Sequence, residues 1–146
     1  MIIYLASDHA GFELKEKVKK FLADSGYTVE DCGAYTLSPS DDYPDFIRKA
    51  AAAVANDLEH SRGVVFGGSG QGEAMVANRA RGVRAAVVYA YSEDIIRLSR
   101  EHNNANVLAI GARFLTEEQA LTAVKLWLET PFSGEERHER RIKKLD

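Results

Sequence analysis

The sequence predicts an α/β fold in which a five-stranded parallel sheet carries helices on both faces. Short apolar runs alternate with longer amphipathic stretches along all 146 residues. This order is typical of parallel sheets, because each crossover between parallel strands usually contains a helix. No segment is repeated and no Ser/Gly-rich linker interrupts the chain, so we expect one domain over residues 1–146.

The strands are expected where short apolar segments are too brief to be helices. They cover residues 2–6, 27–31, 63–66, 84–89 and 107–111. The second of these is the weakest, and the fourth is rich in β-branched residues.

The helices are expected where apolar side chains recur every three or four positions. They cover residues 12–22, 42–57, 73–81, 92–102, 116–128 and 134–145. Gly26 is suited to end the first helix, and Pro44 stands in the first turn of the second. Ser92 is a candidate N-cap, and the segment that begins at Thr116 has the pattern of a capping box.

Composition excludes several classes of protein. The formal net charge of −3 argues against a nucleic-acid binder, which needs a basic surface. The single cysteine, Cys32, fits a reducing compartment and excludes an intrachain disulfide. The start of the chain lacks the basic region of a signal peptide, and no apolar run reaches membrane-spanning length. These features predict a cytoplasmic protein without a membrane partner.

A glycine-rich loop, Gly-Gly-Ser-Gly-Gln-Gly-Glu, occupies residues 67–73. Glycines let backbone N–H groups converge on one point before a helix, so the loop is a candidate anion site. It lacks the lysine of a nucleotide P-loop, and Glu73 stands where the dinucleotide fingerprint requires a final glycine. We interpret the anion as a transient enediolate oxygen, with Glu73 as the base that removes a proton next to a carbonyl. The structural alternative is a tight turn in which Glu73 stabilises the helix dipole.

Polar residues follow two other predicted strands. Asp8 and His9 come after the first strand, and Arg113 comes after the last. Ligands of parallel α/β sheets bind at the carboxyl ends of the strands, so these residues should gather with the glycine-rich loop. The Asp8–His9 pair could bind a hydroxyl and a phosphate, or it could simply cap the next helix.

Further candidates lie toward the end of the chain. His102, at the end of a predicted helix, could be a general acid or could only interact with the helix dipole. Arg137 and Arg141 are four residues apart and therefore share a helical face, which suits a phosphate dianion. The alternative is a solvated helix whose glutamates pair with these arginines. The four histidines are scattered and no carboxylate pair shows ligand spacing, so no metal site is predicted.

Taken in order, several segments resemble the type B ribose-5-phosphate isomerases, which share a superfamily with the subunits of galactose-6-phosphate isomerase. They are Ser-Asp-His-Ala-Gly-Phe at 7–12, Asp-Tyr-Pro at 42–44, the loop at 67–73, Ala-Asn-Arg at 77–79, Ser-Arg-Glu-His-Asn-Asn-Ala-Asn at 99–106 and Arg-His at 137–138. The resemblance covers essentially the whole chain.

One position separates two branches of that family. In many members a cysteine precedes the glycine-rich loop and is the base. Here that position is Gly67, and Cys32 lies far away in the sequence. The other branch has a glutamate just after the loop, so the resemblance supports Glu73 as the base.

The resemblance implies a reaction and a division of roles. His102 would protonate the ring oxygen while Asp8 contacts a sugar hydroxyl, and Glu73 would then move a proton between C2 and C1 through a cis-enediolate. The loop would stabilise this anion through Ser69 and the N–H groups of Gly70 and Gly72. The remaining candidates for substrate binding are Gly68 in the loop, Asn103 for a sugar oxygen, and His9, Arg113, Arg137 and Arg141 for the phosphate, with His138 as a weaker candidate.

The resemblance also implies a Rossmann-like three-layer sandwich and an activity in the non-oxidative branch of the pentose phosphate pathway. No metal or other cofactor is expected. The active sites would lie between the subunits of a homodimer, which could pair into a tetramer. Three other functions stay open: an isomerase of allose or galactose 6-phosphate, a non-catalytic sugar-phosphate binding protein, and, least favoured, a hydride-transfer enzyme.

Overall fold

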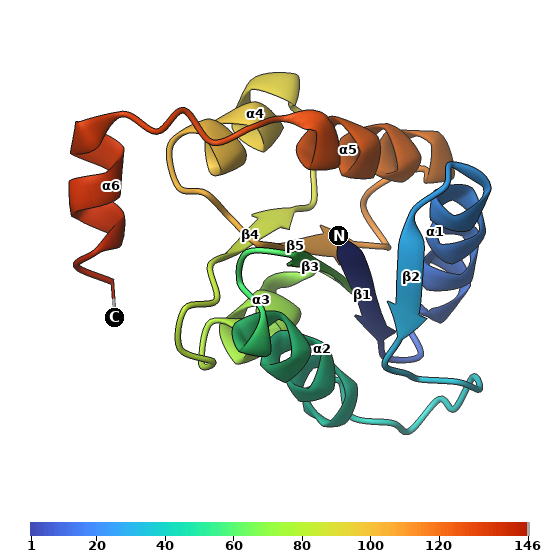
Figure 1. Cartoon of the computed structure of the whole chain (residues 1–146). Coiled ribbons are helices and arrows are strands. Elements are labelled where there is room, and N and C mark those ends of the chain that lie inside the picture. The colour runs from blue at the N-terminus through green and yellow to red at the C-terminus, as the bar shows by residue number, and fades with distance from the viewer. Residues whose placement is uncertain (146) are drawn as a thin grey trace.

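A five-stranded, all-parallel sheet forms the centre of the computed structural model, which describes residues 1–145 (Figure 1). The strands are β1 (Ile2–Ser7), β2 (Thr28–Asp31), β3 (Ser61–Gly67), β4 (Ala85–Val88) and β5 (Val107–Gly111). The helices are α1 (Phe12–Asp24), α2 (Pro44–Asn56), α3 (Gln71–Ala77), α4 (Glu93–Glu101), α5 (Glu117–Glu129) and α6 (Glu136–Ile142). The predicted fold class, a Rossmann-like three-layer sandwich, is confirmed.

The two faces of the sheet carry separate cores. Along β1, Ile3 and Leu5 belong to a cluster with apolar side chains of α1, α4 and α5. Ala6 belongs to a second cluster, formed with side chains of α2 and α3. Figure 1 shows the same division, with α1, α4 and α5 on one side of the sheet and α2 and α3 on the other. Successive strand residues point to opposite faces, which explains how one strand serves both cores.

The order of the strands identifies where a ligand should bind. The sheet runs β2-β1-β3-β5-β4, so the chain moves outward in one direction from β1 and in the other from β3. In open α/β sheets the crevice at such a reversal, outside the carboxyl ends of the strands, is the usual ligand site. The segments that follow β1 and β3 are the ones that carry Asp8, His9 and the glycine-rich loop.

Several predicted element ends were shifted. Helix α3 begins at Gln71, two residues earlier than expected, because Gly70 adopts the left-handed conformation (φ 77°) at the N-cap. It ends at Ala77 rather than at Arg81. Thr116 forms the complete predicted capping box with Gln119, whereas Ser92 occupies its N-cap position without a side-chain hydrogen bond. The last helix is shorter than predicted.

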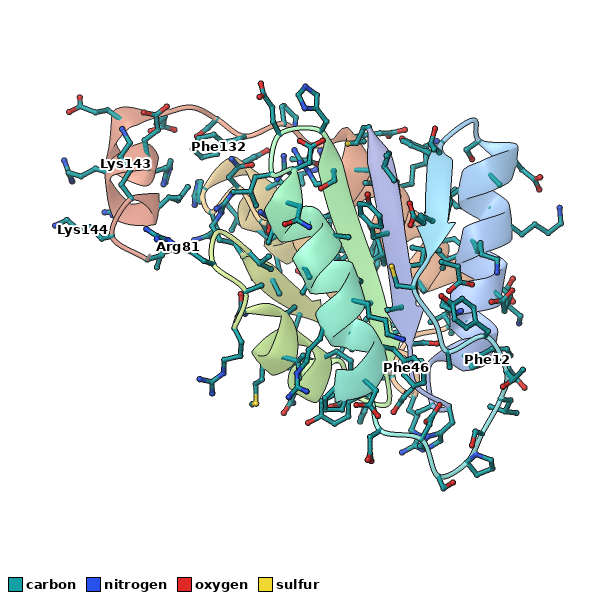
Figure 2. All side chains as sticks on the ribbon, turned by 60° about the horizontal axis from the view of Figure 1, so that its bottom comes forward. Phe12, Phe46, Arg81, Phe132, Lys143 and Lys144 are labelled. Carbon is teal, nitrogen blue, oxygen red and sulfur yellow. The ribbon has the colours of Figure 1, made fainter. Side chains whose placement is uncertain are left out.

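Helix α6 stands apart from the layers, at the end of an extended segment that follows α5 (Figure 1). The side chains of Lys143 and Lys144 project from it away from the sheet (Figure 2). Gly134, at φ 69°, precedes the helix, which is why the helix starts later than the sequence predicts. None of the helices within residues 1–145 is long and apolar enough to cross a bilayer.

Candidate active site

A hollow of about 640 Å³ opens at the carboxyl ends of β1, β3 and β5. It is lined by Asp8 and His9 after β1, by Ser69 and Glu73 around the start of α3, and by Arg113 after β5. The volume lies within the range of ordinary small-molecule sites. The expectation that these three segments meet at one edge is therefore confirmed by the geometry.

Glu73 is the buried carboxylate of this hollow. The residue is only 4% exposed, although it lies in the first turn of α3 and lines the hollow. Burial raises the pKa of Glu73 above its ordinary value; a hydrogen bond from the backbone N–H of Glu73 opposes this in part, and the nearby negative charge of Asp8 adds a smaller rise. No salt bridge to Glu73 occurs among the described residues. A carboxylate in this environment is a better proton acceptor than one in water.

Gly67 provides the space that Glu73 occupies. A Cβ atom at position 67 would overlap the Glu73 carboxyl group. Any side chain at position 67, a cysteine included, would therefore displace the Glu73 side chain from its present place. A cysteine at position 67 and the Glu73 side chain in its present place therefore cannot occur together in this structure.

The glycines of the loop bring the backbone close to its neighbours. Gly70 combines a positive φ with a close approach to the backbone of Ile110 and Gly111, so no other residue fits there. Gly72 packs under the ring of Tyr43, where a Cβ would lie 2.7 Å from the ring. Ser69 is half-buried and its Oγ lies 3.4 Å from the N–H of Gln71. The loop thus presents backbone N–H groups at the start of α3, next to Glu73.

Asp8 fixes the turn that precedes α1 and also lines the hollow, but its side chain does not cap the helix itself. Its Oδ1 accepts hydrogen bonds from the N–H groups of Ala10 (2.9 Å) and Gly11 (3.2 Å), at the start of α1. Asp8 also lines the hollow and lies close enough to Glu73 to influence the pKa of Glu73. These two hydrogen bonds fix the direction of the Asp8 carboxylate without withdrawing it from the site.

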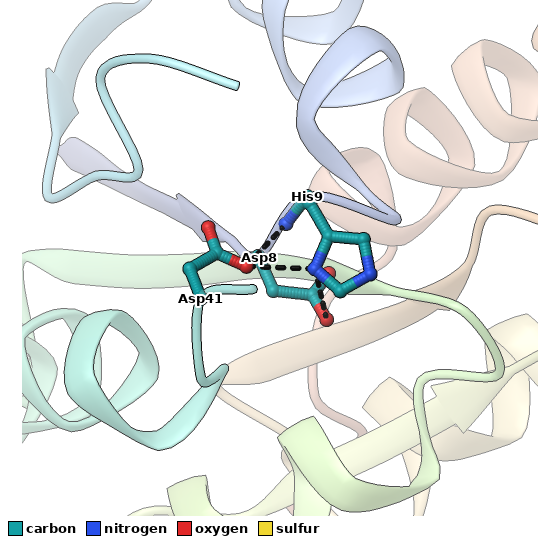
Figure 3. A group of neighbouring side chains, drawn as sticks. All are labelled: Asp8, His9 and Asp41. Carbon is teal, nitrogen blue, oxygen red and sulfur yellow. Dashed lines mark hydrogen bonds and ion pairs between the residues drawn. The ribbon is translucent and has the colours of Figure 1, made fainter. Parts of the chain in front are cut away.

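His9 is held by Asp41, a residue that the sequence analysis did not single out (Figure 3). One Asp41 oxygen, Oδ1, lies 2.7 Å from His9 Nδ1 and accepts the His9 backbone N–H at 3.0 Å. The contact spans 32 residues, so no local spacing reveals it. Donor atoms of Asp8, His9 and Asp41 lie within 4.8 Å of one another, a grouping that could hold a metal ion and that the sequence did not predict. Here Asp41 Oδ1 accepts hydrogen bonds from His9, and Asp8 Oδ1 accepts from Ala10 and Gly11.

Arg113 closes the side of the hollow next to β5. Its backbone N–H donates to the carbonyl oxygen of Gly68 at 3.1 Å, and its guanidinium group packs over Gly68. A Cβ at Gly68 would lie 3.3 Å from one guanidinium nitrogen. The exposed guanidinium group is therefore placed at the rim of the hollow, beside the loop.

His102 and Asn103 lie at the amino ends of the strands, opposite the carboxyl ends where Glu73 lies. His102 is the C-cap of α4, and the turn after it leads into the amino end of β5. A five-residue strand separates that end from the edge with Glu73, a span of roughly 15 Å. Another hollow, of about 390 Å³, lies at this edge and is lined in part by Asn103. Within one chain, His102 is therefore too far away to share a substrate with Glu73.

Helix α6 belongs to this second edge. The rings of His102 and His138 are stacked, with centroids 4.2 Å apart and an interplanar angle of 16°. His138 is buried, and burial followed by the neighbouring His102 lowers the pKa of His138. Arg137 and Arg141 are exposed, and Arg137 pairs with Glu135 at 2.8 Å. The structure thus gathers His102, Asn103 and the α6 residues apart from the Glu73 hollow.

Comparison with known proteins decides the family. The sequence model of the Ribose/Galactose Isomerase family matches residues 3–145. This chain belongs to that family. Ribose-5-phosphate isomerase B of Mycolicibacterium paratuberculosis is 46% identical over 142 residues, which are 97% of this chain and 87% of that protein.

Solved structures of the same isomerase family agree with the fold. The crystal structure of ribose-5-phosphate isomerase B from Mycoplasma genitalium with bound ribulose-5-phosphate has a TM-score of 0.94 at 38% identity, covering 99% of this chain and 93% of that one. A ribose 5-phosphate isomerase from Thermotoga maritima gives a TM-score of 0.91 at 46% identity, covering 99% and 97%. The family resemblance seen in the sequence is therefore confirmed over nearly the whole chain.

Proposed function

We propose that this member of the ribose/galactose isomerase family interconverts ribose 5-phosphate and ribulose 5-phosphate. The observation that carries the proposal is the buried Glu73 carboxylate beside the glycine-rich loop, at the carboxyl edge of the sheet. An aldose–ketose isomerase needs a base next to a site for a developing oxyanion, and this edge offers both. A relative named ribose-5-phosphate isomerase B matches 97% of the chain at 46% identity, which supports the same substrate here.

Glu73 acts as the base once the sugar ring is open. It takes the proton from C2 of the aldose, and the electrons of that bond form the C1–C2 double bond while the carbonyl pair moves to O1. Glu73 then returns the proton to C1, and the O2 hydroxyl proton passes to O1, which gives the ketose. Burial prepares Glu73 for this task because it raises the pKa of its carboxyl group.

The loop stabilises the enediolate. Backbone N–H groups of Gly70 and Gly72, together with the Ser69 hydroxyl, lie at the start of α3, where the helix dipole also favours negative charge. Asp8 contacts a sugar hydroxyl during ring opening. His9 and Arg113, which line the hollow after β1 and after β5, bind the phosphate.

The remaining residues come from a second subunit. His102 and Asn103 lie at the opposite edge of their own chain, so a homodimer that brings this edge onto the partner's hollow completes the site. His102 then protonates the ring oxygen, Asn103 holds a sugar oxygen, and Arg137 and Arg141 complete the phosphate clamp. We also propose a cytoplasmic location, where sugar phosphates are available. The dimers could further pair into tetramers.

The substrate assignment is tested by comparing turnover of five-carbon and six-carbon phosphates. We expect kcat/KM for ribose 5-phosphate to exceed that for allose 6-phosphate and galactose 6-phosphate. A higher value for a six-carbon phosphate would overturn the substrate, and binding without any isomerisation would overturn the enzymatic role.

The shared site is tested by mixing two inactive variants. Glu73→Gln and His102→Asn should each be inactive alone. After the two are unfolded together and refolded, about half of the dimers are mixed and each mixed dimer has one intact site, so about a quarter of wild-type activity should return. No return of activity from refolded mixed dimers would show that Glu73 and His102 do not meet across an interface.

A further inference from the structure

The His9 ring is fixed by two contacts from a single carboxylate oxygen. Asp41 Oδ1 lies 2.7 Å from His9 Nδ1 and accepts the His9 backbone N–H at 3.0 Å. Both the main chain and the ring of His9 are therefore tied to the same atom, and rotation of the ring would break the shorter contact. Figure 3 shows the other ring nitrogen, Nε2, on the side of the imidazole away from Asp41.

The backbone that carries Asp41 is anchored, while Asp41 Oδ2 is buried without a hydrogen-bond partner within residues 1–145. The side chain of Asp41 is only 10% exposed, and its backbone N–H donates to Ser38 O at 3.2 Å. The loop that carries Asp41 begins beside the end of β1, where Ser7 exchanges backbone hydrogen bonds with Gly33 and Ala34. The loop ends at Pro44, in the first turn of α2. Asp41 thus projects toward His9 from a segment fixed at both ends.

A carboxylate at Nδ1 determines the form of the histidine. An ionised carboxylate only accepts hydrogen bonds, so Nδ1 must carry the proton. Nε2 is then the nitrogen left for a ligand in the hollow that His9 lines. When His9 takes a second proton, Nε2 becomes a donor, and the negative charge of Asp41 compensates the positive ring. The other charged or titratable groups around the hollow are Asp8, Tyr43, Glu73 and Arg113.

We propose that Asp41 is a positioning residue for substrate phosphate: it accepts the Nδ1–H of His9 and so directs Nε2 to the phosphate, to which Nε2–H donates when the ring is the imidazolium. This inference rests on the proposed isomerase function, and it assigns a role in that site to a residue outside the hollow's own lining. Asp41 touches no substrate in this scheme and acts only through His9.

Kinetics separate this role from a general effect on the fold. We expect Asp41→Asn to raise KM for ribose 5-phosphate about tenfold and the inhibition constant of inorganic phosphate by a similar factor, with kcat within about twofold of wild type. The control is Asp42→Asn, which removes the same charge from an adjacent exposed residue and should change neither constant. Unchanged KM and phosphate inhibition in a folded Asp41→Asn protein would overturn the proposal, and so would a loss confined to kcat.

A double-mutant cycle tests whether Asp41 acts through His9. His9→Asn should raise the same two constants, and adding Asp41→Asn to it should have little further effect, because the group that Asp41 positions is already gone. Fully multiplicative effects of the two substitutions would mean that Asp41 acts independently of His9, which contradicts the proposal.

Nitrogen NMR gives a readout that needs no turnover. Neutral His9 in the wild type should carry its proton on Nδ1, and Asp41→Ala should move a substantial share of it to Nε2. Wild-type His9 protonated mainly on Nε2 would overturn the proposal. If the protein failed to isomerise any sugar phosphate, the proposed function would be wrong, while the tautomer and the affinity for inorganic phosphate would still decide the role of Asp41.

Discussion

Two buried ionisable residues, on helices that cover opposite faces of the sheet, have opposite environments. Lys15 of α1 is fully buried, and its ammonium group donates to both oxygens of Asp31 at 2.7 and 2.8 Å and to the carbonyl oxygen of Ala34 at 2.6 Å. Glu73 of α3 is almost as deeply buried but has no salt bridge among the described residues. The surroundings of Lys15 supply three hydrogen-bond acceptors for its ammonium group, whereas the surroundings of Glu73 supply no cation for its carboxylate within residues 1–145.

The difference appears in the pKa values. Burial alone would raise the pKa of Asp31, but hydrogen bonds from Lys15 and Lys19 outweigh it and the pKa is lowered. At Glu73 burial is not outweighed, and the pKa is raised. A buried charge with partners stabilises the chain around it, here the start of the loop that carries Asp41, whereas a buried carboxylate without them is available to accept a proton.

The largest effect is expected from removing the base. Glu73→Gln keeps the size of the side chain but cannot accept a proton, so kcat should fall by about 10³-fold or more, while KM changes little. Steady-state assays with ribose 5-phosphate, supported by a direct binding measurement, provide the check. If kcat stayed near the wild-type value, the base would have to be another group.

Removing the buried ion pair between Lys15 and Asp31 should lower the free energy of unfolding and leave kcat nearly unchanged. Lys15→Met removes the central cation and leaves Asp31 buried with Lys19, which should lower the free energy of unfolding by about 3 kcal/mol. For a chain of this size that corresponds to a fall in Tm of roughly 10 °C. The matched control is Lys17→Met, which breaks the exposed pair with Glu117 and should cost about 0.5 kcal/mol or less. Equal losses in the two variants would mean that burial does not distinguish these lysines.

Filling the space beside Glu73 should reduce activity without removing the carboxylate. Gly67→Ala places a Cβ where the Glu73 carboxyl group lies, so the base must move and kcat should fall about 10- to 100-fold. In a Glu73→Ala background the added methyl group has room, and thermal stability should be nearly unaffected there. Wild-type kcat in Gly67→Ala would show that the position of Glu73 is not critical.

The smallest effect is a gain in stability when the buried charge of Glu73 is removed. The raised pKa means that the folded state binds the proton more tightly than the unfolded chain. Ionisation of Glu73 therefore destabilises the fold increasingly as pH rises through the interval between the two pKa values, and by a constant amount above it. Glu73→Gln should be more stable than wild type by about 1 kcal/mol at pH 7.5. Thermal unfolding at pH 7.5 and pH 4 should show the larger advantage at pH 7.5, and the reverse order would contradict the raised pKa.

The sequence by itself determined the α/β class, the approximate position of every strand and helix, the glycine-rich loop with Glu73, and the family. These features are local or follow from chain order: apolar periodicity reports secondary structure, and strand ends of a parallel sheet must share an edge. The exact start of α3 at Gln71 was missed because it depends on the backbone conformation of Gly70.

Only the tertiary structure decided which distant residues meet. Asp41 reaches His9 across 32 positions, Lys15 finds Asp31 across a helix-to-strand packing contact, and Gly67 makes room for a side chain from the next helix. The same holds for the separation of His102 from Glu73, because that distance depends on which end of β5 each residue adjoins. Contacts of this kind depend on how elements pack against one another. The sequence shows which face of an element is buried, but it has no periodic signal for which distant side chain that face meets.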